Sequence, residues 1–307
     1  MKKIIEVENF TKSYGDVHAV RGISFFVEEG KLFSFLGPNG AGKSTTIDTL
    51  CTLMDYDSGK ITVSGYDLRK DAQAVRQNIG VVFQDSVLDG LLTVRENLTI
   101  RAGLYAKRKS DIKAMVNDAA SVIDLSEFMG RPYGKLSGGQ RRRADIAAAL
   151  LHKPKILFLD EPTTGLDPQT RLAVWETIKK LQADSGMTVF LTTHYMEEAT
   201  DSDYIMVIDH GKIAARGTPQ ELKTQYSSDS LQLVATGIEA VEHIEKTLNQ
   251  MKMAYSINGS VITVKLHDTM AATAVLESCR AHIASFQVLQ GSMDDAFIGI
   301  TGKGIRS

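Results

Sequence analysis

The pattern of apolar positions divides the first two thirds of the chain into short strands separated by helices. Residues 32–36, 156–159 and 188–192 are largely continuous apolar runs, which is the pattern of parallel strands buried on both faces. Residues 20–28 alternate instead, so only one side of that strand is expected to be buried. The strands predicted in this part cover residues 3–7, 20–28, 32–36, 61–63, 79–83, 156–159, 188–192, 205–208 and 212–215.

Helical periodicity occupies the segments between these strands. Residues 168–183 place Leu172, Trp175 and Ile178 at helical spacing, which predicts an amphipathic helix. The other expected helices cover residues 46–53 and 71–78, and a helix-rich segment over about 85–145 has starts near Thr93, Ser110 and Ser137. This alternation of strands and helices predicts an α/β domain.

The composition changes at a Ser-Ser-Asp-Ser stretch, residues 227–230, which indicates a linker. An Asn258-Gly259 pair beyond it is a strong hairpin signal. The elements expected here are strands over 231–235, 254–257, 261–266 and 284–289, and helices over 239–251, 268–281 and 293–299. Their order predicts a small α+β ferredoxin-like domain. We therefore expect one domain over residues 1–226 and an accessory domain over residues 231–307.

Composition and charge reduce the number of functional classes to which the chain can belong. The chain has 307 residues and a net charge of −2, so its charge gives no indication of nucleic-acid binding or of a polybasic membrane anchor. Cys51 and Cys279 are its only cysteines, which favours reduced thiols in a cytosolic protein over a disulfide framework. No apolar run reaches 18 residues, so any membrane-spanning part is expected to come from another subunit.

A glycine-rich stretch lies between the strand over 32–36 and the next helix, with the spacing of a P-loop. A chance match to a glycine-rich turn is the alternative, which the flanking strand and helix disfavour. Glycines let backbone amides approach an anion, and the helix N-terminus adds a positive dipole. Lys43 is expected to bind the outer phosphates and Ser44 to ligate Mg²⁺. The expected phosphate-binding residues are Gly37, Asn39, Gly40, Gly42, Lys43, Ser44 and Thr45.

A second motif, Leu136-Ser137-Gly138-Gly139-Gln140, is the feature that narrows the family. Along the chain come the P-loop, Gln84, this motif, an apolar strand ending in Asp160-Glu161, then Gly165-Leu166-Asp167 and His194. Over residues 3–225 the chain resembles the ATP-binding cassettes of ABC transporters. The resemblance implies a P-loop NTPase fold, in which a mixed sheet with helices is joined by a helical subdomain over about residues 85–145. It also implies ATP and Mg²⁺ as cofactors.

The resemblance also implies three catalytic residues. Glu161 is similar to the base that orients or deprotonates the attacking water, and His194 to the histidine that donates to the γ-phosphate. Lys43 completes this set as the charge on the outer phosphates. A purely structural role is the alternative for Glu161 and for His194.

Further residues are expected to bind Mg²⁺ and the adenine ring of ATP. Asp160 ends a buried strand, where a carboxylate can bind Mg²⁺ together with Ser44 and Gln84. The resemblance gives Gln84 the additional role of sensing the γ-phosphate, and its alternative is an ordinary surface glutamine. Tyr14 resembles the aromatic residue that stacks on adenine. Its alternative is a structural tyrosine at a strand end.

The second motif reads as another helix start that can approach an anion, with Ser137 as the N-cap. In the family, Ser137 and Gly139 of one copy would cover the γ-phosphate held by Lys43 of another. Asp167 resembles the residue that communicates across that interface. ATP would thus join two cassettes, and hydrolysis would release them. Residues 141–143 are three arginines, for which a solvated helix face with an ion pair is favoured over a nucleic-acid patch.

Several segments, among them Thr93-Val94-Arg95-Glu96-Asn97-Leu98, resemble bacterial multidrug or antibiotic-resistance exporters with a separate membrane subunit. The expected function is therefore the ATPase subunit of an exporter. It would act as a homodimer on a separate integral membrane permease, at the cytoplasmic face of the membrane and without nucleic acid. The alternatives are a soluble cassette ATPase acting on ribosomes or DNA, and an importer subunit.

Overall fold

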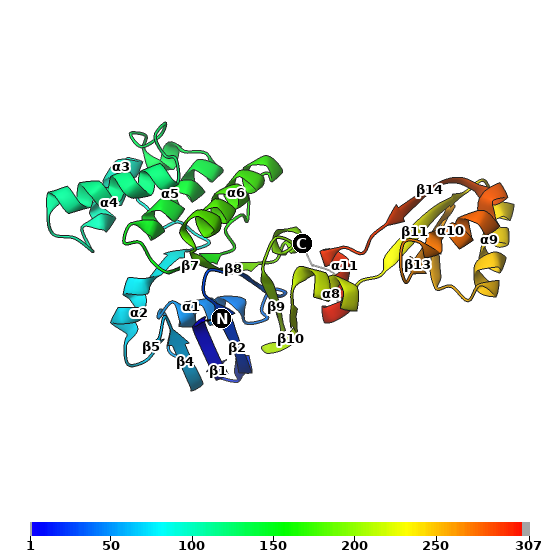
Figure 1. Ribbon diagram of the computed structural model, residues 1–307, viewed down its shortest axis with the longest axis horizontal. Coiled ribbons are helices and arrows are strands. Elements are labelled where there is room, and N and C mark those ends of the chain that lie inside the picture. The colour runs from blue at the N-terminus through cyan, green and yellow to red at the C-terminus, as the bar shows by residue number, and fades with distance from the viewer. Residues whose placement is uncertain (1, 303–307) are drawn as a thin grey trace. The chain divides into compact units, whose positions relative to one another are not determined.

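The computed structural model describes residues 2–302, in which the chain forms two compact units (Figure 1). The first unit ends at Thr218 and the second begins at Pro219. None of the described helices combines the length and the hydropathy needed to cross a bilayer.

The boundary between the units differs from the one expected at residue 226. Helix α8 (Pro219–Tyr226) belongs to the second unit, where it packs against α11 (Met293–Thr301). The approach is so close that a Cβ atom on Gly299 would clash with the carbonyl oxygen of Tyr226. The sequence did not indicate this, because the two helices are far apart along the chain.

The first unit is built on two sheets. The larger sheet has the strand order β10-β9-β3-β8-β7-β6, with parallel pairs except at β10, which joins β9 in antiparallel orientation. Its strands are β3 (Leu32–Leu36), β6 (Ile79–Val82), β7 (Ile156–Asp160), β8 (Thr188–Thr193), β9 (Tyr204–Asp209) and β10 (Lys212–Gly217). The smaller, antiparallel sheet has the order β2-β1-β4-β5 and consists of β1 (Lys3–Tyr14), β2 (Val17–Glu28), β4 (Ser58–Val63) and β5 (Tyr66–Asp67).

Strand β7 shows why the apolar runs are continuous. Leu157 and Leu159 belong to one hydrophobic core, and Ile156 and Phe158 belong to another. The first core also includes residues of the helical subdomain, and the second includes residues of the antiparallel sheet. Successive side chains of a strand point to opposite faces, so a strand between two cores has no polar side. The expected α/β fold is confirmed.

The helical starts expected near Thr93, Ser110 and Ser137 are confirmed. Thr93 and Ser137 each form a capping box, in which the side chains of Glu96 and Gln140 accept from the N-cap amides. The helices of the first unit are α1 (Lys43–Leu50), α2 (Ala72–Asn78), α3 (Val94–Ala102), α4 (Lys109–Val122), α5 (Gly138–Leu150), α6 (Pro168–Ser185) and α7 (Met196–Ala199), with a 3₁₀ turn at Tyr133–Lys135.

The second unit confirms the ferredoxin-like prediction. Its antiparallel sheet has the order β12-β13-β11-β14, and α9 and α10 share its buried core. Ile244 and Leu248 of α9 pack there with alternate residues of β11. The elements are β11 (Asp229–Ala235), α9 (Ile238–Gln250), β12 (Tyr255–Asn258), β13 (Val261–Leu266), α10 (Ala271–Cys279) and β14 (Ile283–Leu289), with a 3₁₀ turn at Arg280–His282.

Candidate functional site

The glycine-rich loop joins β3 to α1. Gly42 is the N-cap of α1 with a φ of 109°, and a Cβ atom there would lie 2.6 Å from the carbonyl oxygen of Ala19. Gly37 is also closed to side chains, because a Cβ atom would clash with the backbone of Ile208. The helix starts at Lys43, three residues before the expected start. The loop therefore leads its backbone directly into a helix N-terminus, which is the geometry that binds phosphate.

Lys43 is buried inside this loop. Its ammonium donates to the carbonyl oxygens of Gly37 at 2.8 Å and Pro38 at 3.3 Å, and it lies 3.9 Å from Glu161 Oε1. Burial lowers the pKa of Lys43, whereas the charges of Glu161 and Asp160 raise it. The loop thus holds a positive charge beside the ends of two parallel strands.

Asp160 and Glu161 follow one another at the carboxyl end of β7. The Thr192 hydroxyl donates to Asp160 Oδ1 at 2.5 Å, and the Glu161 amide donates to the Thr192 carbonyl oxygen at 3.1 Å. Burial raises the pKa of Asp160, and the hydrogen bond from Thr192 opposes that shift. Glu161 has a φ of 44°, a left-handed conformation that non-glycine residues seldom adopt. Such conformations cluster at functional sites.

The carboxylate of Glu161 lies between the other two expected catalytic residues. Its Oε1 faces Lys43 Nζ at 3.9 Å, and its Oε2 lies 3.3 Å from His194 Nδ1. The Thr164 hydroxyl donates to Oε2 at 3.2 Å and orients the group. His194 Nδ1 is buried and makes no hydrogen bond to any residue that the structure describes. The structure therefore brings Lys43, Glu161 and His194 together.

Tyr14 and Gln84 form their hydrogen bonds with residues outside this cluster. Tyr14 is exposed, and its hydroxyl donates to Met54 Sδ at 2.6 Å. Gln84 is exposed, and its carbonyl oxygen accepts from Arg142. Within residues 2–302, no hydrogen bond or ion pair joins either side chain to Lys43 or Glu161. Their roles toward adenine and Mg²⁺ remain predictions.

The second motif begins α5, and it contacts the start of α6. Ser137 is exposed as the N-cap of α5, and a Cβ atom on Gly139 would clash with the Thr170 side chain. Asp167 is the N-cap of α6 and accepts from the Thr170 amide at 3.0 Å and from its hydroxyl at 2.5 Å. These hydrogen bonds, led by that of the hydroxyl, lower the pKa of Asp167. Gly139 and Asp167 thus both contact Thr170, which places the starts of α5 and α6 side by side.

Arg142 is a site residue that the sequence analysis missed. Only 7% of it is exposed, so the solvated-face interpretation is wrong for this residue. Its guanidinium donates to the carbonyl oxygens of Phe83 at 2.6 Å, Gln84 at 3.2 Å and Glu161 at 3.5 Å. The available signal was its helical spacing from the buried Ile146. Arg143 does form the expected ion pair, at 3.7 Å from Asp124.

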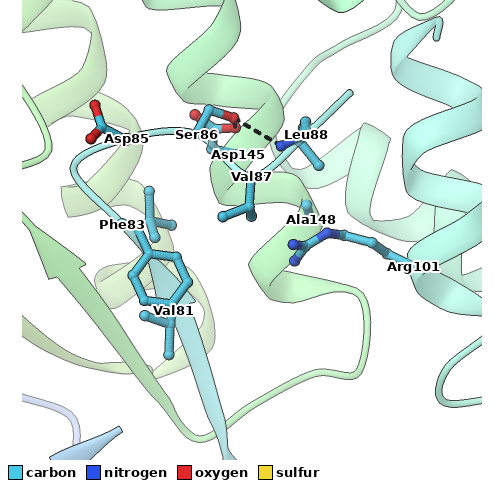
Figure 2. A pocket seen from close by; sticks show the side chains of 10 residues that line it. Val81, Phe83, Asp85, Ser86, Val87, Leu88, Arg101, Asp145 and Ala148 are labelled. Carbon is cyan, nitrogen blue, oxygen red and sulfur yellow. Dashed lines mark hydrogen bonds between the residues drawn. The ribbon is translucent and has the colours of Figure 1, made fainter. Parts of the chain in front are cut away.

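A small cavity lies beside the segment that follows Gln84, where this segment meets α3 and α5 (Figure 2). The Ser86 hydroxyl donates to Asp145 Oδ1 at 2.6 Å and accepts from the Leu88 amide at 3.2 Å. Burial raises the pKa of Asp145. The space open to the centre of a water molecule is about 10 Å³, which holds one water at most. The cavity is therefore a small packing gap between α3, α5 and the segment that follows Gln84, and it is too small for a substrate.

Two family models match the chain. The ABC transporter model matches residues 20–164. This range includes the glycine-rich loop and ends before the start of α6. The model of the C-terminal domain of ATP-binding proteins like DrrA1-3 matches residues 217–301, which include α8 as the structure does. The second match extends over the unit that begins at Pro219.

Relatives of similar length match nearly the whole chain. The linearmycin resistance ATP-binding protein LnrL of Bacillus subtilis is 36% identical over 99% of this chain and 100% of its own. The daunorubicin/doxorubicin resistance ATP-binding protein DrrA of Streptomyces peucetius is 36% identical over 98% of this chain and 93% of its own.

Solved structures agree with the fold of the first unit. The ATP-binding cassette MJ0796, solved as a dimer with ADP and Pi, has a TM-score of 0.63 and 27% identity, covering 70% of this chain and 98% of its own. CbiO1 from Clostridium perfringens, part of an ABC transporter complex, has a TM-score of 0.69 and 27% identity. The match covers 82% of this chain and 97% of the CbiO1 chain. This chain therefore belongs to the ABC transporter family, as an ATP-binding protein with a DrrA-like C-terminal domain.

Proposed function

We propose that this chain hydrolyses ATP to drive the export of drugs or other small molecules through a separate membrane permease. The observation that carries the proposal is the contact of Glu161 with both Lys43 and His194. The names of the relatives, which concern resistance to linearmycin and to daunorubicin, support an antibiotic-like substrate. The chain would act at the cytoplasmic face of the membrane.

The nucleotide would lie on the glycine-rich loop, with Lys43 on the outer phosphates and Tyr14 on the adenine. Ser44, Gln84 and Asp160 offer hydroxyl, amide and carboxylate oxygens, a donor set that fits Mg²⁺. A bound Mg²⁺ would neutralise charge on the phosphates. Thr192 supports this assignment, because its hydrogen bond fixes one oxygen of Asp160. Glu161 would accept the proton of the attacking water.

We further propose that two copies enclose each ATP between them. Ser137 and Gly139 of one copy would cover the γ-phosphate held by Lys43 of the other, and Asp167 would lie at the same interface. The exposure of Ser137 and Asp167 supports this arrangement, as does the dimeric structure of the cassette MJ0796.

Ser137→Arg tests the head-to-tail arrangement. A long cation at the start of α5 should obstruct the second copy, so ATP-dependent dimers should disappear while a single copy still binds ATP. Light scattering of the Glu161→Gln background with ATP measures the dimer. Ser110→Arg, which makes the same change at the exposed start of α4, is the matched control. Undiminished dimerisation of the Ser137 variant would contradict the arrangement.

The surface for the membrane partner is proposed to lie on the helical subdomain. Around α3, large apolar side chains are exposed, among them Leu91 at 90% and Leu104 at 79%. Ile100 of α3 and Tyr105 just after this helix are also exposed, and large exposed apolar side chains are those that a partner protein buries on binding.

Leu104→Glu should weaken the permease complex by placing a charge in this surface. We expect at least a tenfold loss of co-purified permease from detergent extracts, since a buried unpaired charge costs several kcal/mol. ATP binding by the chain alone should be unchanged. Val122→Glu, at an exposed position on α4, is the control. Equal recovery of the permease with both variants would refute this assignment of the surface.

The same purification separates the alternatives. A co-purified polytopic membrane protein supports transport, whereas co-purified ribosomes or DNA would support a soluble cassette ATPase. Vesicles that contain the complex then distinguish export from import, by the direction in which substrate moves when ATP is added on the side of the cassettes.

A further inference from the structure

Glu198 is a buried carboxylate that the proposed mechanism does not use. It lies in the short helix α7, is 4% exposed, and forms no ion pair with any residue in the described part of the chain. Burying a charge without partners is costly, so such a group needs hydrogen-bond donors. Two buried threonine hydroxyls supply them: Thr163 donates to Oε1, and Thr193 donates to Oε2 at 2.5 Å.

These threonines belong to two different segments of the candidate site. Thr163 lies two residues after Glu161, in the loop that ends at Asp167. Thr193 ends β8 and immediately precedes His194. The β7–β8 ladder ends at the pair Asp160 and Thr192. Beyond that pair, the Glu198 carboxylate is a side-chain bridge between the two segments.

The bridge continues into the backbone beside His194. Thr193 Oγ1 also accepts from the Tyr195 amide at 3.0 Å, so the carboxylate, the hydroxyl and the amide form one chain of hydrogen bonds around His194. The two hydroxyls donate to different oxygens of the Glu198 carboxylate, so both of its oxygens have a partner. The bridge therefore constrains the segment of Glu161 relative to that of His194.

We infer that Glu198 is a positioning residue for ATP hydrolysis, which holds His194 at its short distance from Glu161 by binding Thr163 and Thr193 together. This inference rests on the proposed roles of Glu161 and His194. Displacements of about 1 Å at a reacting group can cost about 10²-fold in rate. The proposed nucleotide affinity depends on the glycine-rich loop instead, and among the described residues no hydrogen bond or ion pair joins Glu198 to this loop.

Glu198→Gln tests the inference with the shape of the side chain retained. The two threonines donate to different oxygens of Glu198, and an amide replaces one of these oxygens with an NH2 group that donates, so one of the two hydrogen bonds is lost in its present form. We expect kcat to fall about 10- to 100-fold, with KM and the Kd for ATP within about twofold of wild type. Glu197→Gln makes the same change at the adjacent, exposed position and should keep the wild-type kcat.

Threonine variants separate positioning from a loss of folding. Thr163→Val and Thr193→Val should each lower kcat, and their effects should be non-additive because both hydroxyls bind one carboxylate. Thr163→Ser and Thr193→Ser retain the hydroxyls and should restore most of the activity. Wild-type kcat in Glu198→Gln, or a loss only in proportion to unfolded protein, would overturn the inference. Wild-type kcat in Glu161→Gln would instead refute the proposed function.

Discussion

Glu161→Gln is expected to bind ATP normally and to lower turnover by roughly 10²–10⁴-fold. An amide keeps the size of the side chain, and its oxygen can still accept from Thr164, but it cannot take a proton from water. The dimer should therefore form with ATP and fail to separate. Phosphate release measures the first effect, and size-exclusion chromatography with ATP and Mg²⁺ measures the second.

The control for this variant is Glu176→Gln, which changes an exposed glutamate of α6. It should hydrolyse ATP like the wild type and show no trapped dimer. If Glu161→Gln retained wild-type turnover, Glu161 would not be the base, and its left-handed backbone conformation would need another explanation.

Lys43→Ala should remove tight ATP binding. Hydrogen bonds to charged groups contribute about 1.5–3 kcal/mol each, so losing the ammonium from the outer phosphates should weaken binding about 100-fold or more. Alanine also leaves the carbonyl oxygens of Gly37 and Pro38 without the donor that they have in the wild type. Isothermal titration calorimetry with ATP measures the change.

Lys60→Ala is the matched control, because Lys60 is an exposed lysine of β4. It should bind ATP with wild-type affinity. A Lys43→Ala protein that is folded and binds ATP like the wild type would remove the glycine-rich loop from the candidate site.

The elements predicted correctly are those whose burial follows from local pattern. Residues 156–159 of β7 and 189–191 of β8 are continuously apolar because each strand contacts two cores, and α3 and α5 begin after residues that cap them. The second half of β1 was missed, because its polar residues are half exposed in a hairpin with β2. Helix α7 has four residues, which is too short for a periodic signal.

The candidate site was predictable where sequence motifs follow the carboxyl ends of buried strands. The motifs indicated Lys43, Glu161 and His194, and the structure shows that they meet. The bonds that support them were not predictable. Arg142 donates to backbone carbonyl oxygens. Every residue type has one, so the sequence does not reveal which residues are the partners of Arg142. The bridge at Glu198 was not predictable because one of its partners, Thr163, lies 35 residues away along the chain and meets it only in the folded protein.

Arg142 has a consequence for a pair of copies. It lies on the helix that begins at Ser137, and it binds the carbonyl oxygens of Gln84 and Glu161. Each chain would offer Glu161 to the nucleotide on its own loop and Ser137 to the nucleotide on its neighbour. A shift at one catalytic centre would then reach the other through a single guanidinium, so we expect cooperativity, with a Hill coefficient above one for ATP.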